Sequence, residues 1–246
     1  MDVYNPLYSD YEQGKIKDVL ATLNDQNQFY GAQNWYPLLR NITPTSHLFE
    51  LSNDEIKDLS EGKIPTGPCF RKSITDLIKN YQFVKTTHKS AHAFKPIHNF
   101  EDFEDQMSNA NIIMSFRRYK CKYLLFRKWT DMNLECRVYV NKGIVKYVEL
   151  YRDEKDEFEV NMFTDIIKFV NESVIPSLTI YDTFTADVYY TGNSENKWQV
   201  VEINSPLWLK CGTYLIKYEW ERRRIHESET PICRYTDRHT KEIIEL

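Results

Sequence analysis

The segment Ala186–Pro206 contains two acids and an amide whose spacing can form a binding site. Asp187 and Glu202 lie on consecutive strands of a predicted hairpin, so they can face each other across it. Asn204 follows Glu202 by two residues, and the alternation of side chains along a strand puts both on one face of the sheet. Two carboxylates and an amide oxygen form an oxygen-only ligand set, which suits a magnesium ion that also binds substrate phosphates. The same pattern also fits a solvated strand edge that carries ordinary charges.

The residues around Glu202 favour the metal site over the solvated edge. In VVEIN, the flanking valine and isoleucine side chains should bury the strand. A buried carboxylate needs a partner, because its charge is costly to remove from water. We therefore take Asp187, Glu202 and Asn204 as the candidate metal ligands.

Basic and hydroxyl side chains earlier in the chain can bind the phosphates that such a metal would hold. Lys85 ends the predicted strand QFVK and leads into TTHKSAH, whose hydroxyls and small side chains can fold over a triphosphate. Arginine grips phosphate oxygens with a rigid fork, whereas lysine acts as a point charge. The candidate nucleotide-binding residues are Lys85, Ser90, Arg127, Lys128, Trp129, Arg137, Asp187, Glu202 and Asn204.

Two other patterns are given no chemical role. His88 and His92 are four residues apart, as zinc ligands on one helix face would be, but no third ligand is evident and the H-E-x-x-H pattern is missing. Cys136 has no histidine nearby in the sequence, which favours a buried structural thiol over a nucleophile. The sequence assigns no catalytic residue.

Hydrophobic periodicity predicts the elements that position these residues. The expected strands are Gln82–Thr86, Tyr123–Trp129, Glu135–Val140, Ile144–Leu150, Ala186–Tyr190 and Trp198–Ile203, and the expected helices are Ser52–Leu59, Ser73–Lys79, Asn99–Met107 and Phe163–Val174, the last ended by Pro176. Asn141-Lys-Gly143 has the composition of a tight hairpin turn. Antiparallel strands backed by helices make this an α+β protein.

Composition limits the class of protein. The 246 residues are 41% hydrophobic, with a net charge of -4 and five cysteines that form no C-x-x-C pair. The charge gives no reason to expect nucleic-acid binding, and no stretch approaches the roughly 20 apolar residues of a membrane span. No signal peptide is visible, and the scattered cysteines suggest reduced thiols, so we expect a cytoplasmic protein that binds neither nucleic acid nor membrane.

Several motifs occur in the order found in one known family. FRKW, ECRVYV, the strand with Asp187, and VEINSP follow one another, and the early NWYPLLRNITPTS and late TYLIKYEWE flank them. This series, from about Asn34 to Glu221, resembles the cell division cycle protein 123 family, a divergent ATP-grasp group. The family usually has aspartate where this chain has Glu202, and this chain is short for the family.

The resemblance implies roles for individual residues. Lys85 falls where the family has a lysine that touches the nucleotide phosphates, and Arg127 and Lys128 match its arginine-lysine-tryptophan strand. Glu135 and Arg137 match its Glu-x-Arg strand, in which the arginine is expected on the phosphates. Asp187, Glu202 and Asn204 match its metal-binding aspartate, acid and asparagine.

The expected fold is then ATP-grasp, with two lobes of antiparallel sheet backed by helices and ATP between them. We expect a lead-in over residues 1–19, an N-terminal lobe over 20–120, a C-terminal lobe with the metal site over 121–221, and a polar tail over 222–246.

The resemblance implies an assembly chaperone that uses ATP and Mg²⁺ as ligands with little turnover. Its partner would be the gamma subunit of eukaryotic translation initiation factor 2, either the organism's own or a host's. A second hypothesis is an ATP-grasp ligase that phosphorylates a carboxylate and couples the acyl-phosphate to an amine. A third is a protein modifier that transfers phosphate or AMP. The shared WYP segment favours the chaperone.

Overall fold

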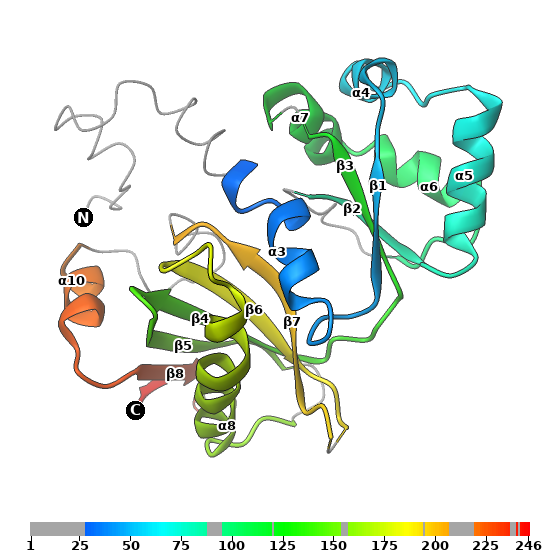
Figure 1. Cartoon of the computed structure of the whole chain (residues 1–246). Helices are drawn as coiled ribbons and strands as arrows, with labels where there is room; N and C mark the ends of the chain where they lie inside the picture. Colours follow the sequence, from blue (N-terminus) through cyan, green and yellow to red (C-terminus); the bar gives the residue numbers. More distant parts are fainter. Residues whose placement is uncertain are drawn as a thin grey trace, which may run out of the picture. The chain divides into compact units, whose positions relative to one another are not determined.

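The computed structural model describes residues 28–246 apart from 88–94, 120, 154–156, 194, 207–218, 237–239 and 241. Ser90, both histidines of the TTHKSAH segment and the lead-in over 1–19 therefore lie outside the described residues. The chain divides into two compact units (Figure 1). Among the described residues, unit 1 comprises Asn41–Thr43 and those from Met132 to Leu246, and unit 2 comprises those from 28 to 40 and from Pro44 to Asp131.

Unit 2 is built on a three-stranded antiparallel sheet in the order β1-β3-β2. Its elements are α3 (Ala32–Leu39), β1 (Ser46–Glu50), α4 (Asn53–Ser60), α5 (Pro68–Ile78), β2 (Phe83–Thr86), α6 (Phe100–Met107), α7 (Ala110–Tyr119) and β3 (Tyr123–Arg127). Phe49, Val84 and Phe126 share one face of the sheet, where they pack with Phe70 and Phe103 of the helices. The opposite face carries Lys85 and Arg127 beside Phe83 and Leu125, so two buried cations lie on the side away from the helical core.

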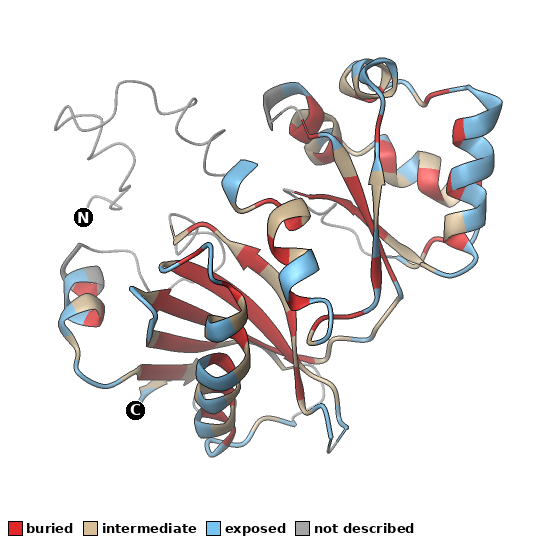
Figure 2. Ribbon diagram, viewed as in Figure 1, coloured by how far each residue is buried: buried red, intermediate tan, exposed pale blue. Residues whose placement is uncertain are grey.

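Unit 1 is built on a six-stranded sheet in the order β7-β6-β4-β5-β8-β9. Its elements are β4 (Leu134–Asn141), β5 (Ile144–Asp153), α8 (Met162–Phe169), a π-helical turn (Val170–Val174), α9 (Ile175–Ser177), β6 (Phe184–Tyr190), β7 (Trp198–Asn204), α10 (Glu219–Glu227), β8 (Ile232–Thr236) and β9 (Ile243–Glu245). Neighbouring strands are antiparallel except for the parallel pair of β5 and β8. The central strands are buried almost throughout (Figure 2).

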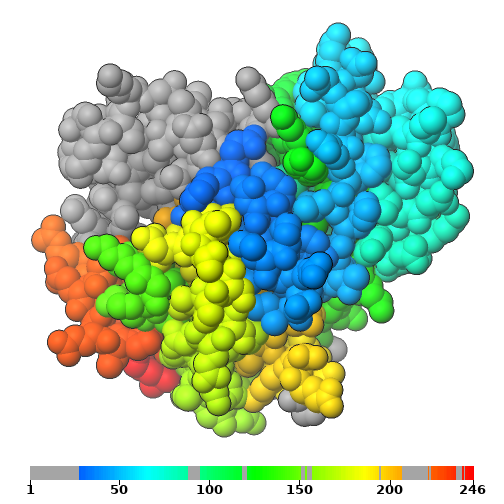
Figure 3. Space-filling model, viewed as in Figure 1, coloured from blue at the N-terminus to red at the C-terminus, as the bar shows by residue number. Residues whose placement is uncertain are grey.

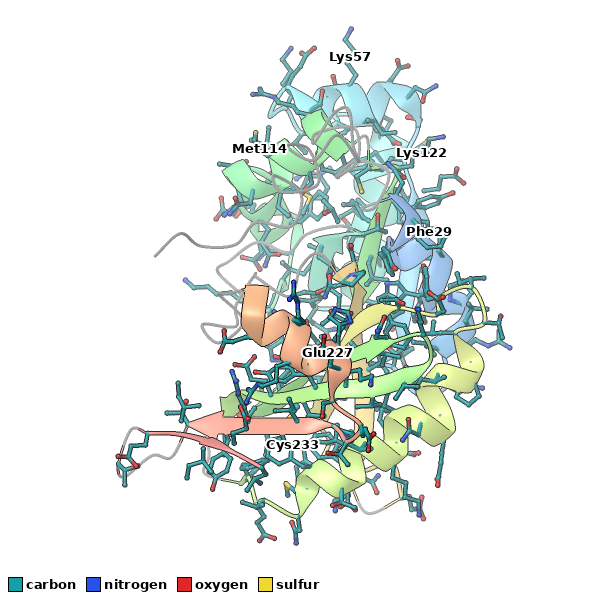
Figure 4. The ribbon with its side chains drawn as sticks, turned by 90° about the vertical axis from the view of Figure 1, so that its left-hand side faces the viewer. Phe29, Lys57, Met114, Lys122, Glu227 and Cys233 are labelled. Atoms are coloured by element: carbon teal, nitrogen blue, oxygen red, sulfur yellow. The ribbon has the colours of Figure 1, made fainter. Side chains whose placement is uncertain are left out.

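Helices α8 and α10 cover opposite faces of this sheet. Phe163 of α8 contacts Tyr235 of β8 with ring centroids 6.3 Å apart. Ile225 of α10 belongs to a buried cluster with Tyr147 and Ile232. Because side chains alternate along β8, the helices lie on different sides. In the space-filling view α8 lies at the outer surface of unit 1, and the side view shows α10, ending at Glu227, over β5 and β8 (Figures 3 and 4).

Most of the predicted elements are present. The strands expected from periodicity correspond to β2 to β7, and the predicted helices to α4, α5, α6 and α8. The helix expected over Phe163–Val174 is α8 followed by the π-helical turn, and it does not end before Pro176, because the proline lies within the short helix α9. The expected polar tail instead forms α10, β8 and β9, of which β8 joins the sheet beside β5.

The division of the chain falls later than the sequence suggests. Strand β3 pairs with β1 and β2, so it belongs to unit 2, and the boundary lies between Asp131 and Met132. A short return of the chain, Asn41–Thr43, belongs to unit 1, because Ile42 accepts a hydrogen bond from the Val200 amide and Thr43 donates one to the Val200 carbonyl. Hydrophobic patterns identify strands but do not show which sheet a strand joins.

The turn between β4 and β5 uses the backbone freedom of glycine. Lys142 and Gly143 both have positive φ values, 51° and 72°, as the expected tight turn requires. This turn, together with a one-residue register shift between Tyr139 and Val140, places Arg137 of β4 opposite Glu149 of β5. A Cβ atom added at Gly143 would meet no heavy atom within 4 Å, so an alanine there would be strained only through its backbone.

Replacing Gly143 by alanine should therefore lower the free energy of unfolding by about 1 kcal/mol, measured by urea denaturation. Gly143→Asn is the matched control, because asparagine adopts a positive φ more readily than alanine and a Cβ at this position meets nothing within 4 Å. The control should change stability little. Equal losses in both variants would show that the backbone of Gly143 is not under this constraint.

Candidate functional site

A row of charged side chains crosses the whole sheet of unit 1. Strand pairing places each member directly opposite the next, so all of them share one face. From β7 to β9 this charged row consists of Glu202, Asp187, Arg137, Glu149, Arg234 and Glu245. The signs alternate except at one step, where two carboxylates stand side by side. A cation would restore the alternation there.

The centre of the charged row is a buried ion pair. Arg137 binds Asp187 with two parallel hydrogen bonds, from Nε to Oδ1 at 2.7 Å and from Nη2 to Oδ2 at 2.9 Å. Their side chains are only 9% and 6% exposed. Such a forked pair fixes both side chains, and removing either partner leaves an uncompensated buried charge. The structure thus joins two residues that the sequence analysis assigned separately to phosphate and to metal.

The three candidate metal ligands lie together at one end of the charged row. Asp187 is opposite Glu202 in the β6–β7 pairing, as the hairpin predicts, and Asn204 lies on the same face. The Asn204 amide lies 3.4 Å from Asp187 Oδ2. Contrary to the expectation from VVEIN, Glu202 is partly exposed, because β7 is the edge strand of the sheet. The buried carboxylate that needs a partner is Asp187, and its partner is Arg137.

This donor set fits a magnesium ion on chemical grounds. Like charges directly opposite each other on a sheet are destabilising, so Asp187 and Glu202 favour a cation between them. Both offer carboxylate oxygens, and Asn204 can offer its amide oxygen, which are the ligands that magnesium prefers. Among the described residues, no group of three or more His, Cys, Asp or Glu side chains is arranged to hold a metal. An ion here would therefore draw further ligands from phosphate or water.

Glu149 is a member of the charged row that the sequence analysis missed. It is 6% exposed, and within the described part of the chain its Oε2 atom has no hydrogen-bond partner. Burial raises its pKa to about 7, against the opposite effect of Arg137 and Arg234 and with a smaller contribution from Asp187. The only signal in the sequence was one acid in the apolar run IVKYVEL. Its place opposite Arg137 depends on the strand register, which the sequence does not give.

Arg234 closes the charged row from β8. It binds Glu245 of β9 at 2.5 Å and lies 3.5 Å from Glu221 of α10. Its guanidinium also lies over the ring of Tyr147 at 5.7 Å, beside the hydrophobic contacts of α10. The segment expected to be a polar tail therefore supplies two charged residues, Arg234 and Glu245, on this side of the sheet.

Unit 2 brings two of the predicted phosphate-binding residues onto one face. Lys85 pairs in register with Leu125, two residues from Arg127, so both cations share the face opposite the apolar core. Both are buried, at 3% and 2% exposed, and Arg127 Nε donates to Ser46 Oγ at 3.1 Å. Cations held away from water in this way are suited to bind anions strongly.

The remaining sequence candidates are placed differently. Lys128 follows the end of β3 and is exposed, and Trp129 donates from Nε1 to Asp131 and lies near Phe83, with ring centroids 6.5 Å apart. The thiol of Cys136 is fully buried on β4, and burial raises its pKa well above the usual value. A protonated, inaccessible thiol agrees with the structural role predicted for it.

Asp187→Ala should destabilise the protein by about 3–5 kcal/mol without nucleotide, because it leaves the Arg137 charge buried and unpaired. Asp187→Asn should cost less, since the amide keeps a hydrogen-bond acceptor. Asp76→Ala, which removes an exposed ion pair with Lys72 and Lys79, is the control and should have little effect in the same urea titration. Similar stability of all variants would contradict the central role of the buried pair.

Comparisons with known proteins agree with this architecture. No family model matches the sequence, and no curated protein matches it. The structure of Cdc123 from Schizosaccharomyces pombe matches with a TM-score of 0.60 and 17% identity over 86% of this chain and 96% of that one. Its C-terminally truncated form matches with a TM-score of 0.64 and 15% identity, over 87% and 98%. A RimK domain ATP-grasp protein from Sphaerobacter thermophilus shows a weaker likeness, with a TM-score of 0.41 and 11% identity over 85% and 66%. The chain thus shares the fold of Cdc123, and the predicted α+β ATP-grasp fold is confirmed.

Proposed function

We propose that this chain binds ATP together with Mg²⁺ and acts as an assembly chaperone for the gamma subunit of translation initiation factor 2 in the cytoplasm. The observation that carries the nucleotide site is the pair of facing carboxylates, Asp187 and Glu202, at the end of a charged row that continues with Arg137. This arrangement offers a cation site and an arginine fork on one sheet face.

Each residue of this proposal has a distinct task. Asp187 and Glu202 bind the metal from opposite strands, and Asn204 adds a neutral oxygen on the same face. Bound magnesium would neutralise part of the charge on the phosphate oxygens. For Lys85 and Arg127 of unit 2, the sequence resemblance implies contacts to nucleotide phosphates.

The chaperone role is supported by fold and by motif order together. The chain shares the fold of Cdc123 over most of both chains, and its WYP segment forms α3, in which Trp35 is buried and Tyr36 donates from its hydroxyl to the Ser46 carbonyl. In this role ATP stabilises a binding-competent state, since a ligand that binds only the folded protein adds to its stability. Among the described residues no helix is long and apolar enough to cross a membrane.

Glu202→Gln should weaken binding of magnesium-ATP at least ten-fold in calorimetric titrations, because one of two facing carboxylates loses its charge. Glu202 is partly exposed, so the variant should fold normally. Glu195→Gln, an exposed acid in the β6–β7 hairpin, is the matched control and should leave affinity unchanged. Affinity that does not respond to Glu202→Gln would rule out the proposed metal site.

Binding to purified initiation factor 2 gamma subunit should strengthen when magnesium-ATP is added. Surface plasmon resonance with and without nucleotide measures the effect, and Glu202→Gln should abolish the nucleotide dependence while leaving the nucleotide-free affinity unchanged. If ATP binds but the gamma subunit does not, the chaperone proposal fails. Release of ADP on addition of carboxylate and amine acceptors would then identify a ligase.

A further inference from the structure

Arg137 has a carboxylate on each side of it in the charged row. On β6 it faces Asp187, to which it is bound, and on β5 it faces Glu149. In-register neighbours on adjacent strands lie about 5 Å apart at Cβ, well within reach of a guanidinium group. Arg137 can therefore change partners by a side-chain movement alone.

Glu149 is buried and has one carboxylate oxygen that could accept a hydrogen bond from Arg137. It is 6% exposed, and Oε2 has no hydrogen-bond partner within the described part of the chain. Arg234, its neighbour on the other side, already binds Glu245 and lies near Glu221. A buried carboxylate oxygen without a hydrogen bond is costly, so a donor that moves within reach of Oε2 would be bound favourably.

We propose that Glu149 is a positioning residue for Arg137, and that it receives the arginine when a divalent cation occupies Asp187. This inference rests on the proposed function. A cation bound to Asp187 neutralises the carboxylate that now binds Arg137. The Arg137 guanidinium then leaves Asp187 and donates to Glu149 Oε2. Glu149 then fixes Arg137 on the sheet face, where it can meet a phosphate of the same nucleotide.

The charges around Glu149 agree with this exchange. The groups that face it are Arg137 on β4 and Arg234 on β8, with Tyr147 two residues earlier on its own strand, and Asp187 acts on it from β6, one strand beyond Arg137. Asp187 disfavours ionised Glu149, and the two arginines favour it. Metal binding at Asp187 would remove the unfavourable charge and bring Arg137 closer, so both effects stabilise the Glu149 carboxylate in the metal-bound state.

The test compares magnesium-ATP with metal-free ATP in EDTA, both titrated at pH 8 against the wild type and Glu149→Gln. The variant should bind magnesium-ATP about ten-fold more weakly, the effect of losing one charge-assisted hydrogen bond, and metal-free ATP equally well. Only the metal-bound state uses Glu149, so a purely structural role would change both affinities together. Glu221→Gln, which neutralises a buried acid 3.5 Å from Arg234, is the control and should leave the ratio of the two affinities unchanged.

The variant should also remain folded. The raised pKa of Glu149 means that the folded state binds its proton more tightly than the unfolded state, so the ionised carboxylate lowers stability as pH rises through about 7. Glu149→Gln removes that cost and should be no less stable than the wild type at pH 8.

A second variant makes the coupling direct. In an Arg137→Gln background, Glu149→Gln should change magnesium-ATP affinity less than two-fold, because the arginine it positions is gone. Equal effects on metal-bound and metal-free ATP, or no effect on either, would overturn the inference while leaving the proposed function intact. If the wild type fails to bind magnesium-ATP at all, the proposed function is wrong and the inference falls with it.

Discussion

The buried pair of Arg137 and Asp187 is the interaction on which unit 1 depends. It joins β4 to β6 through side chains, at the middle of a sheet whose other face is packed against α8. Two charges removed from water are stable only when geometry and hydrogen bonds compensate for the lost hydration, and the forked contact supplies both. From this pair toward β9 the charges of the row alternate in sign, so each charged side chain is opposite one of the other sign.

The two ends of the charged row differ in how the protein covers them. Toward β8 the row is closed by Glu221 and Glu245 and lies beneath the hydrophobic contacts of α10. Toward β7 it ends in two facing carboxylates, one of them partly exposed. At the β8 end the charges therefore alternate in sign among protein side chains, whereas the β7 end presents two carboxylates opposite each other, where we propose that the cation binds.

Sequence reasoning predicted the parts of this site that depend on local pattern. The register of Asp187 against Glu202 followed from a hairpin, and the pairing of β4 with β5 followed from a turn with glycine. It did not predict that Arg137 binds Asp187, because their strands are separated by β5 and α8 and their adjacency depends on sheet order. Glu149 was missed for the same reason. The role of an acid within an apolar strand cannot be inferred until the residues opposite it on both neighbouring strands are known. The C-terminal strands were missed because their few apolar residues lie among charges that the sheet itself neutralises.

The parallel pairing of β5 and β8 has a consequence for how the molecule assembles. Antiparallel hairpins close through short turns, but β8 reaches β5 only after β6, β7 and α10 have been passed along the chain. Contacts between segments so distant in sequence form slowly, because the entropy of closing a long loop is lost before the contacts stabilise the chain. Until β8 docks, Glu149 has Arg137 on one side and lacks Arg234 on the other, and the face that we propose for the nucleotide is electrostatically incomplete. Competence to bind ligand would then be acquired as a late event of folding, so that a nucleotide present in the cell selects chains whose last strands are in place.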